Sequence, residues 1–261
     1  MFSQKGGTAV SFNVLMYHEF REQGDFDVTK PSTISVAQNY QDALPTVLFS
    51  YVDDFKIQMD YLKSEGYHTL TLQEIKNFYE KGTELPEKSV LVTVDDAFQS
   101  VYKYAYPILK KLQFHAVGFV VLGWLSQEKK AFDPTTSIVM SKQELEEMKD
   151  VFEFANHTTD LHVRHLDGTT EMQTASLQEL KKDLAACGEY VTYPDVFAYP
   201  FGIYTAEDTK RLAEANINYA FNTDPGINTK NTSLLELHRD TVTLGCTLEE
   251  FKAIIERREN K

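Results

Sequence analysis

Short apolar runs alternate along this chain with longer stretches in which apolar residues recur at helical spacing. The runs are rich in β-branched and aromatic residues and show no polar–apolar alternation, which is typical of strands buried on both faces. We predict strands at residues 12–17, 67–70, 90–94, 116–122, 152–155, 196–199, 219–221 and 235–237. We predict helices at residues 52–65, 72–79, 101–112, 141–149, 177–190, 205–215 and 248–258.

This order of strands and helices predicts a parallel sheet covered by helices. The chain shows neither an interdomain linker nor an internal repeat, so we expect one α/β domain over residues 1–261 that forms a (β/α) barrel. A doubly wound open sheet is the alternative, but no GxGxxG or GxxxxGK[ST] segment supports nucleotide binding. In a (β/α) barrel, active residues lie at the C-terminal ends of the strands.

Two adjacent carboxylates, Asp95 and Asp96, follow the apolar run 90–94. Two negative charges this close repel each other, and the pKa of at least one rises unless a cation lies between them. One interpretation is a metal ligand next to a general base. The other is a strand-to-loop junction in which the pair caps a helix.

Further polar residues follow other predicted strands. His18 follows the first strand, Pro200 and Phe201 follow the run 196–199, and His238 and Arg239 follow the run 235–237. Three of the seven histidines, His157, His162 and His165, fall within nine residues after the run 152–155. Two imidazoles and a carboxylate form a common catalytic zinc set, and a cluster of surface histidines is the alternative.

Composition limits the possible partners. The chain has 26 basic and 39 acidic residues, a formal net charge of −13, which argues against nucleic acid and anionic membranes. With only Cys187 and Cys246 present, a metal site has to be built from His, Asp and Glu. No stretch approaches the ~18 apolar residues of a membrane span, and no signal peptide is recognisable. We therefore expect a soluble chain.

The combination of these motifs resembles the polysaccharide deacetylases, a family of carbohydrate esterases (family four). The segment Thr93-Val94-Asp95-Asp96-Ala97 is similar to the family's T-F-D-D-G motif, and His157-Thr158 with His162 is similar to its His-Ser/Thr motif. The branch that acts on poly-N-acetylglucosamine in biofilms is the most similar in these motifs. The resemblance covers residues 13–242 and implies a distorted (β/α) barrel. It also implies removal of acetyl groups from a polysaccharide or oligosaccharide substrate of a cell wall or biofilm. No protein partner can be inferred from the sequence.

The resemblance also implies roles for individual residues. Asp96, His157 and His162 would bind a divalent metal, most often zinc, with cobalt or nickel as alternatives, and Asp95 would be the general base. The metal would lower the pKa of a bound water from ~15.7 toward ~7. The backbone N–H of Phe201 would donate to the oxyanion. The family mostly acts outside the membrane, so a cell-surface or extracellular location is expected if an export signal was removed.

The chain departs from the family pattern at several positions. Ala97 replaces glycine, so the turn has to avoid positive φ or accept strain. Ala198 replaces the arginine that orients the base, and we expect Arg239 to take its place. The final Leu-x-His motif does not fit, so His238 is the candidate acid and His18 the alternative.

Five further residues have open assignments. Asp160 could orient a ligand histidine, and His165 is the reserve ligand. Trp124, together with Tyr17 and Tyr199, could stack on sugar rings or belong to the core.

Two other functions remain open: a carbohydrate-binding barrel that lost its chemistry, and a glycosidase with two carboxylates. Adjacent Asp95 and Asp96 are too close to flank a glycosidic bond, because that geometry needs a separation of about 5 Å or more.

Overall fold

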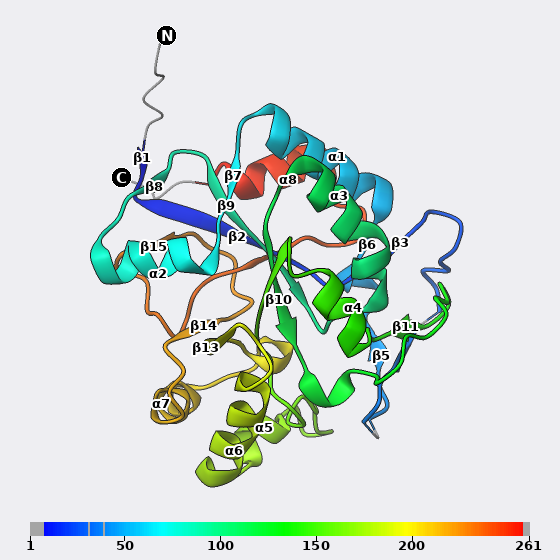
Figure 1. The fold of residues 1–261 in the computed structure, drawn as a ribbon, viewed down its shortest axis with the longest axis vertical. Coiled ribbons are helices and arrows are strands. Elements are labelled where there is room, and N and C mark those ends of the chain that lie inside the picture. Colours follow the sequence, from blue (N-terminus) through cyan, green and yellow to red (C-terminus); the bar gives the residue numbers. More distant parts are fainter. Residues whose placement is uncertain (1–7, 31, 39, 258–261) are drawn as a thin grey trace.

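The computed structural model describes residues 8–30, 32–38 and 40–257, and a curled, mostly parallel sheet forms its centre (Figure 1). Neighbouring strands follow the order β14-β13-β12-β10-β9-β2, all paired in parallel. Their bounds are β2 Ser11–Tyr17, β9 Ser89–Asp95, β10 Ala116–Val120, β12 Phe152–Asn156, β13 Tyr193–Ala198 and β14 Tyr219–Phe221. This order follows the chain without the reversal of a doubly wound sheet, so the predicted (β/α) barrel-like fold is confirmed.

The last part of the chain links the two edges of this sheet. Leu237 forms a parallel bridge with Phe221 of β14, and β16 (Asp240–Thr241) pairs with β2. The predicted strand at 235–237 is therefore reduced to one bridge. Two short strands add to the sheet: β7 (His68–Thr69) pairs with β9, and β15 (Asn228–Thr229) pairs antiparallel with β2. The segment 237–241 carries Arg239 across the gap between the edges.

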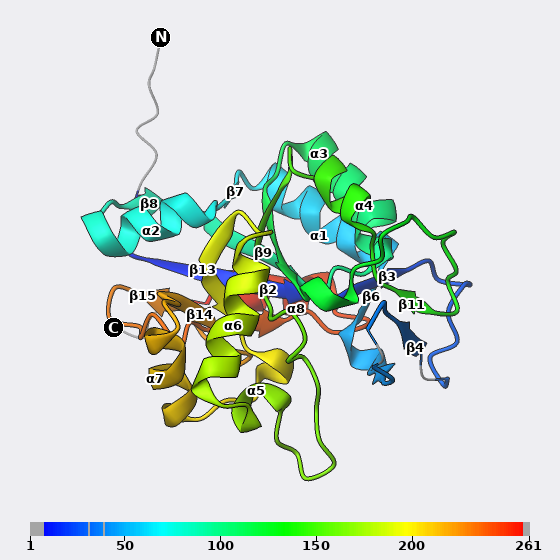
Figure 2. The same ribbon diagram turned by 60° about the horizontal axis from the view of Figure 1, so that its bottom comes forward.

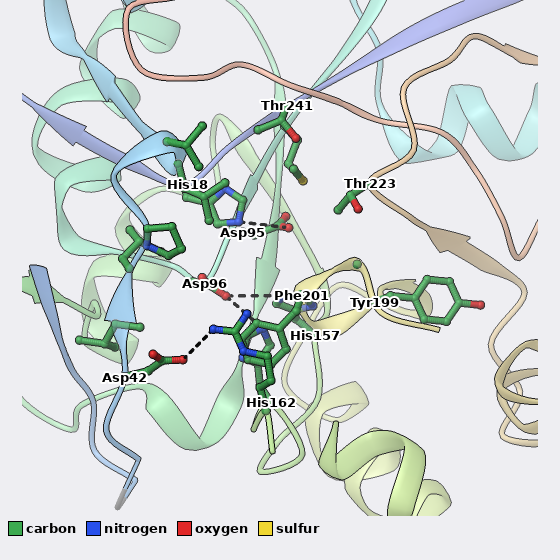
Figure 3. A pocket seen from close by; sticks show the side chains of 18 of the residues that line it. His18, Asp42, Asp95, Asp96, His157, His162, Tyr199, Phe201, Thr223 and Thr241 are labelled. Carbon is green, nitrogen blue, oxygen red and sulfur yellow. Dashed lines mark ion pairs between the residues drawn. The ribbon is translucent and has the colours of Figure 1, made fainter. Parts of the chain in front are cut away.

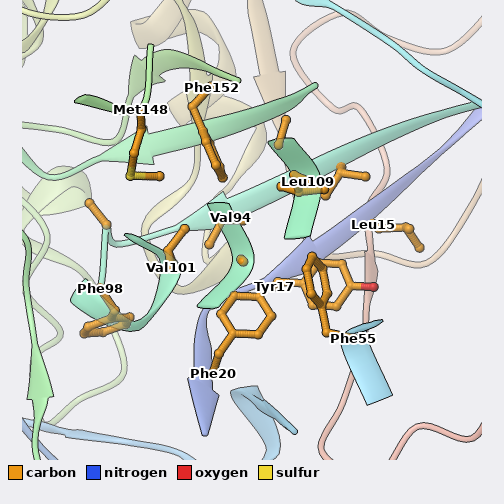
Figure 4. Close-up of a cluster of buried hydrophobic side chains, with 14 of the residues drawn as sticks. Leu15, Tyr17, Phe20, Phe55, Val94, Phe98, Val101, Leu109, Met148 and Phe152 are labelled. Atoms are coloured by element: carbon orange, nitrogen blue, oxygen red, sulfur yellow. The ribbon is translucent and has the colours of Figure 1, made fainter. Parts of the chain in front are cut away.

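The strands are buried because their sequences are almost entirely apolar. All seven residues of β9 are buried, and the largest core cluster joins β2 and β9 to the helices outside them (Figure 4). Tyr17 and Phe20 pack on Phe55 of α1 with ring centroids 5.1 and 4.8 Å away. Fully burying such a side chain contributes about 1.5–3 kcal/mol, so this core fixes the strand ends in space.

Eight helices in the described part of the chain surround the sheet (Figure 2). They are α1 Val52–Ser64, α2 Leu72–Lys81, α3 Tyr106–Leu112, α4 Lys142–Glu147, α5 Glu171–Thr174, α6 Leu177–Gly188, α7 Ala206–Glu214 and α8 Leu248–Ile255. The capping boxes of α2 and α4, at Thr71 and Ser141, are present. Residues 101–105 form a π-helical segment before α3. Residue 258, the predicted end of the last helix, lies outside the described residues.

The polar segment between β2 and α1 folds into small sheets. Its strands are β3 Glu19–Arg21, β4 Ser32–Ser35, β5 Ala43–Leu44 and β6 Phe49–Tyr51, and β4 also pairs with β11 Ser137–Ile138. These strands gather beyond the C-terminal end of β2 (right in Figure 2). At the opposite end, β1 Thr8–Ala9 pairs with β8 Leu85–Pro86. The segment 32–48 therefore becomes a wall over the strand ends.

Candidate active site

A cavity of about 300 Å³ opens at the C-terminal ends of the parallel strands (Figure 3). Parallel strands place their carboxyl ends at one edge of the sheet, so residues distant in sequence meet there. The polar residues that line it include His18, Asp42, Asp95, Asp96, His157, His162, Arg164, Thr223 and Thr241. Its apolar wall includes Leu44, Pro45 and Leu48 from the segment 32–48. The cavity thus combines titratable groups with an apolar side.

Asp96, His157 and His162 form a group in which ligand atoms lie within 4.8 Å of one another. The Nε2 atoms of both histidines lie 3.5 Å from Oδ1 of Asp96. All three side chains are buried, and Oδ1 of Asp96 has no hydrogen-bond partner among the described residues. A buried carboxylate oxygen without a partner, facing two imidazole nitrogens, fits a divalent cation.

The tautomer of His157 also fits a metal ligand. Its Nδ1 lies 2.7 Å from the carbonyl oxygen of Ala198, and a carbonyl can only accept, so Nδ1 carries the hydrogen. The lone pair of Nε2 is then directed toward Asp96. Hydrogen bonds of this kind fix the ring orientation of metal-binding histidines.

The electrostatics of this group favour a positive charge. Burial, and then the neighbouring charge of Asp95, raise the pKa of Asp96 well above its usual value. Burial lowers the pKa of both His157 and His162, so these imidazoles are neutral near pH 7. A cation bound between the three side chains would stabilise the ionised form of Asp96.

The backbone turns sharply where these ligands leave their strands. Asp96 and Ala97 have φ of 70° and 57°, and Thr158 has φ of 77°. Non-glycine residues in this region are strained by about 1–3 kcal/mol each. The structure therefore resolves the expectation for Ala97: the turn keeps the positive φ that glycine would adopt easily, and alanine accepts the strain. Hydrogen bonds from the Asp96 N–H to the Phe119 carbonyl and from the Met140 N–H to the Ala97 carbonyl hold this turn.

Asp95 forms a two-pronged ion pair with Arg239, the residue expected to replace the missing family arginine. Nη1 and Nη2 of Arg239 donate to the two carboxylate oxygens over 2.7 and 2.9 Å. Its Nε donates to the carbonyl of Asn222, and the side chain is fully buried. Burial alone would raise the pKa of Asp95, but the guanidinium outweighs it and lowers the pKa to about 2. Asp95 is therefore ionised and fixed in orientation.

The sequence profile described as polysaccharide deacetylase matches residues 82–220, slightly more than half of the chain. The chain belongs to the polysaccharide deacetylase family. Poly-β-1,6-N-acetyl-D-glucosamine N-deacetylases are among its relatives. The protein of that name from Staphylococcus aureus strain MSSA476 is 32% identical over 186 residues, which cover 69% of this chain and 62% of the relative. That from Staphylococcus epidermidis is 30% identical over 175 residues, covering 64% and 59%.

Solved structures of deacetylases share the fold. Streptococcus pyogenes deacetylase PplD, solved in complex with acetate, superposes with a TM-score of 0.75 at 23% identity and covers 96% of this chain and 100% of that one. IcaB from Ammonifex degensii gives a TM-score of 0.68 at 23% identity, covering 95% and 97%. The barrel of this chain is thus that of the polysaccharide deacetylase fold.

The two candidate acids lie in different places. His18 lines the cavity that holds Asp96, His157 and His162, with Nε2 3.9 Å from Oδ2 of Asp95. Burial lowers the pKa of His18 to about 4, against the opposing charge of Asp95. His238, the first candidate, lines a separate cavity. The reason is the path of the segment 237–241: Arg239 points inward to Asp95, so its neighbour His238 does not.

Phe201 lies at the cavity wall in a strained turn. Its φ is 59°, and its ring centroid lies 4.3 Å from that of His162. The guanidinium of Arg164 lies over the Phe201 ring at 5.0 Å, and its Nη2 lies 3.7 Å from Asp42. Sequence reasoning missed Arg164 and Asp42, although Arg164 lies inside the His-dense segment.

The other assignments have separate outcomes. His165 pairs with Glu171 at 3.1 Å outside the cavity and is not the reserve ligand. Asp160 accepts through its backbone carbonyl from Gln38, and its side chain lies against Gly123, where an added Cβ would be 2.2 Å from Oδ1. The three candidate stacking residues, Tyr17, Trp124 and Tyr199, are about 1% exposed. Tyr17 belongs to the core, whereas Trp124 and Tyr199 also line the cavity.

None of the helices in the described residues has the length and apolar character needed to cross a membrane.

Proposed function

We propose that this protein is a metal-dependent hydrolase that removes N-acetyl groups from N-acetylhexosamine residues of a polysaccharide. Poly-N-acetylglucosamine or a peptidoglycan-like polymer, outside the cell membrane, is the substrate class. One observation carries the proposal: the group Asp96, His157 and His162 shares a cavity with Asp95, whose carboxylate is paired with Arg239. The relatives named as N-deacetylases support it. The alignment spans 62% of the length of the Staphylococcus aureus relative, so the same activity is a proposal for this chain.

The metal would be held by Asp96, His157 and His162. Zinc suits two imidazoles and one carboxylate, with cobalt or nickel as alternatives, and such a set leaves coordination positions open. When bound, the ion supplies Lewis acidity toward the acetamide carbonyl and toward a water molecule.

Asp95 would act as the general base. It is ionised, because Arg239 holds its pKa at about 2, and its carboxylate lies in the cavity beside the proposed ligands. It would take the proton of the attacking water. The backbone N–H of Phe201 would donate to the oxyanion that forms, and one such donor is typically worth about 3 kcal/mol.

His18 would protonate the departing amine. At rest its ring is neutral, because burial holds its pKa at about 4, so it would carry a proton only during turnover. Asp95, whose Oδ2 lies 3.9 Å from Nε2 of His18, would pass on the proton taken from water. The net result is one water consumed, one acetate released and one free amine formed.

A carbohydrate-binding barrel without catalysis is the rival function. Two departures from the family pattern would favour it: Ala97 replaces a glycine, and Ala198 replaces an arginine. Arg239 supplies a cationic partner for Asp95, and Ala97 adopts the glycine-like φ of 57°. Both observations favour the enzyme.

Product analysis tests the proposal. The zinc-loaded protein should release acetate from N-acetylglucosamine oligomers and leave their chain length unchanged. Asp95→Asn should bind zinc with the same stoichiometry and release almost no acetate. A folded, zinc-loaded protein that releases no acetate from any N-acetylated oligomer would exclude the proposed activity, and shortened oligomers would indicate a glycosidase instead.

A further inference from the structure

A second, open cavity of about 650 Å³ lies beside the candidate active site. It is formed by residues that follow β13 and β14 and by the segment 227–238. Cavities of this size hold small molecules or sugar units. Most of the side chains that line it are polar, namely Tyr204, Asn222, Asp224, Thr229, Asn231, Thr232, Ser233, Glu236 and His238. No step of the proposed reaction uses this cavity.

The two cavities share a wall. Tyr199 lines the first and Tyr204 the second, and their rings stack with centroids 4.3 Å apart and an interplanar angle of 16°. Thr223 lines the first cavity, while its neighbours Asn222 and Asp224 line the second. The two cavities are therefore adjacent, separated by this pair of stacked rings.

The second cavity carries negative charge without a positive partner. No lysine or arginine in the described residues forms an ion pair with Asp224 or Glu236, whereas Glu207 and Glu249 on the helices each pair with a lysine. Burial, and then the charges of Glu236 and Asp224, raise the pKa of Tyr204, so both carboxylates lie close to its hydroxyl. Asn222 Nδ2 donates to that hydroxyl over 3.2 Å, and a hydrogen bond between Tyr204 and Glu236 also raises the pKa of Tyr204.

His238 adds an unused hydrogen-bonding atom to this wall. Its backbone is held on both sides by Asn228, whose Oδ1 accepts from the His238 N–H and whose Nδ2 donates to the His238 carbonyl. The ring lies against Gly226, where an added Cβ would come within 2.8 Å of Cγ. Its Nδ1 is buried without a partner among the described residues. A buried polar atom without a partner at a cavity wall indicates a ligand group that completes it.

We propose that this cavity is a subsite for a hexosamine unit that has already lost its acetyl group, with its ammonium facing Asp224 and Glu236. The sugar hydroxyls would bond to Tyr204 and His238. The proposal rests on the proposed function, because it assumes an aminosugar polymer. An acidic subsite next to the reacting unit would make partly deacetylated chains better ligands than fully acetylated ones, so free amines would accumulate beside one another along the polymer.

Direct binding tests this subsite without turnover. The probe is a trimer of β-linked glucosamine, which has no acetyl group to lose, titrated by calorimetry into the full chain at low and at 0.5 M salt. We expect Glu236→Gln and Asp224→Asn each to weaken binding about fivefold, as for partly exposed ion pairs, and the double variant more. Binding to the unaltered chain should weaken at high salt.

The matched control is Glu214→Gln, an exposed residue at the end of α7 with the same change in charge. It should bind the trimer like the unaltered chain. Thermal unfolding checks that each variant is folded. Equal affinity for the control and the double variant overturns the subsite. Loss of acetate release from acetylated oligomers, with trimer binding still sensitive to Glu236→Gln, would contradict the proposed function and leave the subsite standing.

Discussion

At the scale of single residues, the ion pair between Asp95 and Arg239 determines the electrostatics of the site. Both side chains are buried, and the guanidinium bonds to both carboxylate oxygens. Without that partner, burial would favour the protonated carboxyl group. Arg239 therefore decides both the charge and the orientation of the proposed base, although it is far from Asp95 in sequence.

Arg239→Ala should reduce both activity and stability. Removing one partner of a buried pair costs about 3–5 kcal/mol, so we expect a loss of this size at pH 7 in urea unfolding. The pKa of Asp95 in the native protein, about 2, is below the ordinary 3.8. Its ionisation therefore stabilises the fold above about pH 4 and ceases to do so as the pH falls toward 2. In the variant, burial without the guanidinium raises the pKa of Asp95, so ionisation of Asp95 destabilises the fold.

The destabilisation by Arg239→Ala should consequently be smaller at pH 4 than at pH 7. Lys56→Ala, which removes an exposed pair with Asp60, is the control and should cost less than about 1 kcal/mol at either pH. A loss that is the same at both pH values would argue against the role of Asp95 ionisation.

His18→Gln should lower kcat by about 10²–10⁴, the usual contribution of a positioned general acid, with a smaller change in KM. His18 lies at the cavity and His238 outside it, so His238→Gln should lower kcat much less. Zinc content should stay unchanged in both variants. A larger kcat loss in His238→Gln than in His18→Gln would return the acid role to His238.

At the scale of elements, helix starts were predictable because their signals are local. Thr71 and Ser141 are each followed by a glutamate three residues later, the sequence signature of a capping box, and both capping boxes form. The apolar strands were predictable for the same reason, since β9 is buried along its whole length. The segment 32–48 carries no such periodicity, so its small strands, and the cavity wall they form, could not be predicted.

Ser141→Ala should destabilise the protein more than Ser176→Ala. In both helices the serine accepts from the backbone and bonds to a glutamate, but Ser141 and Glu144 are fully buried, whereas Ser176 and Glu179 are not. Losing a cap costs about 0.5–2 kcal/mol, and a buried glutamate left with fewer donors adds to that cost. We expect about 2 kcal/mol for Ser141→Ala and about 0.5 kcal/mol for Ser176→Ala. Equal losses in urea unfolding would contradict this difference.

At the scale of the whole molecule, the site depends on how the sheet closes. The sequence placed Asp96, His157 and His162 after strands, and the parallel sheet brings them together. The sequence could not decide whether His18 or His238 is the general acid, because that choice depends on which side of the segment 237–241 faces inward. A two-residue strand and one bridge set this orientation, and such short pairing leaves no pattern in the sequence.

The central claim is that one metal ion, held by Asp96, His157 and His162, is required for acetate release. The most direct measurement titrates zinc into chelator-treated protein and follows acetate released from N-acetylglucosamine oligomers, with His157→Ala alongside. The account predicts almost no release without metal, a rise that levels off at about one zinc per chain, and no comparable rise in the variant. Full acetate release from the chelated protein would contradict it.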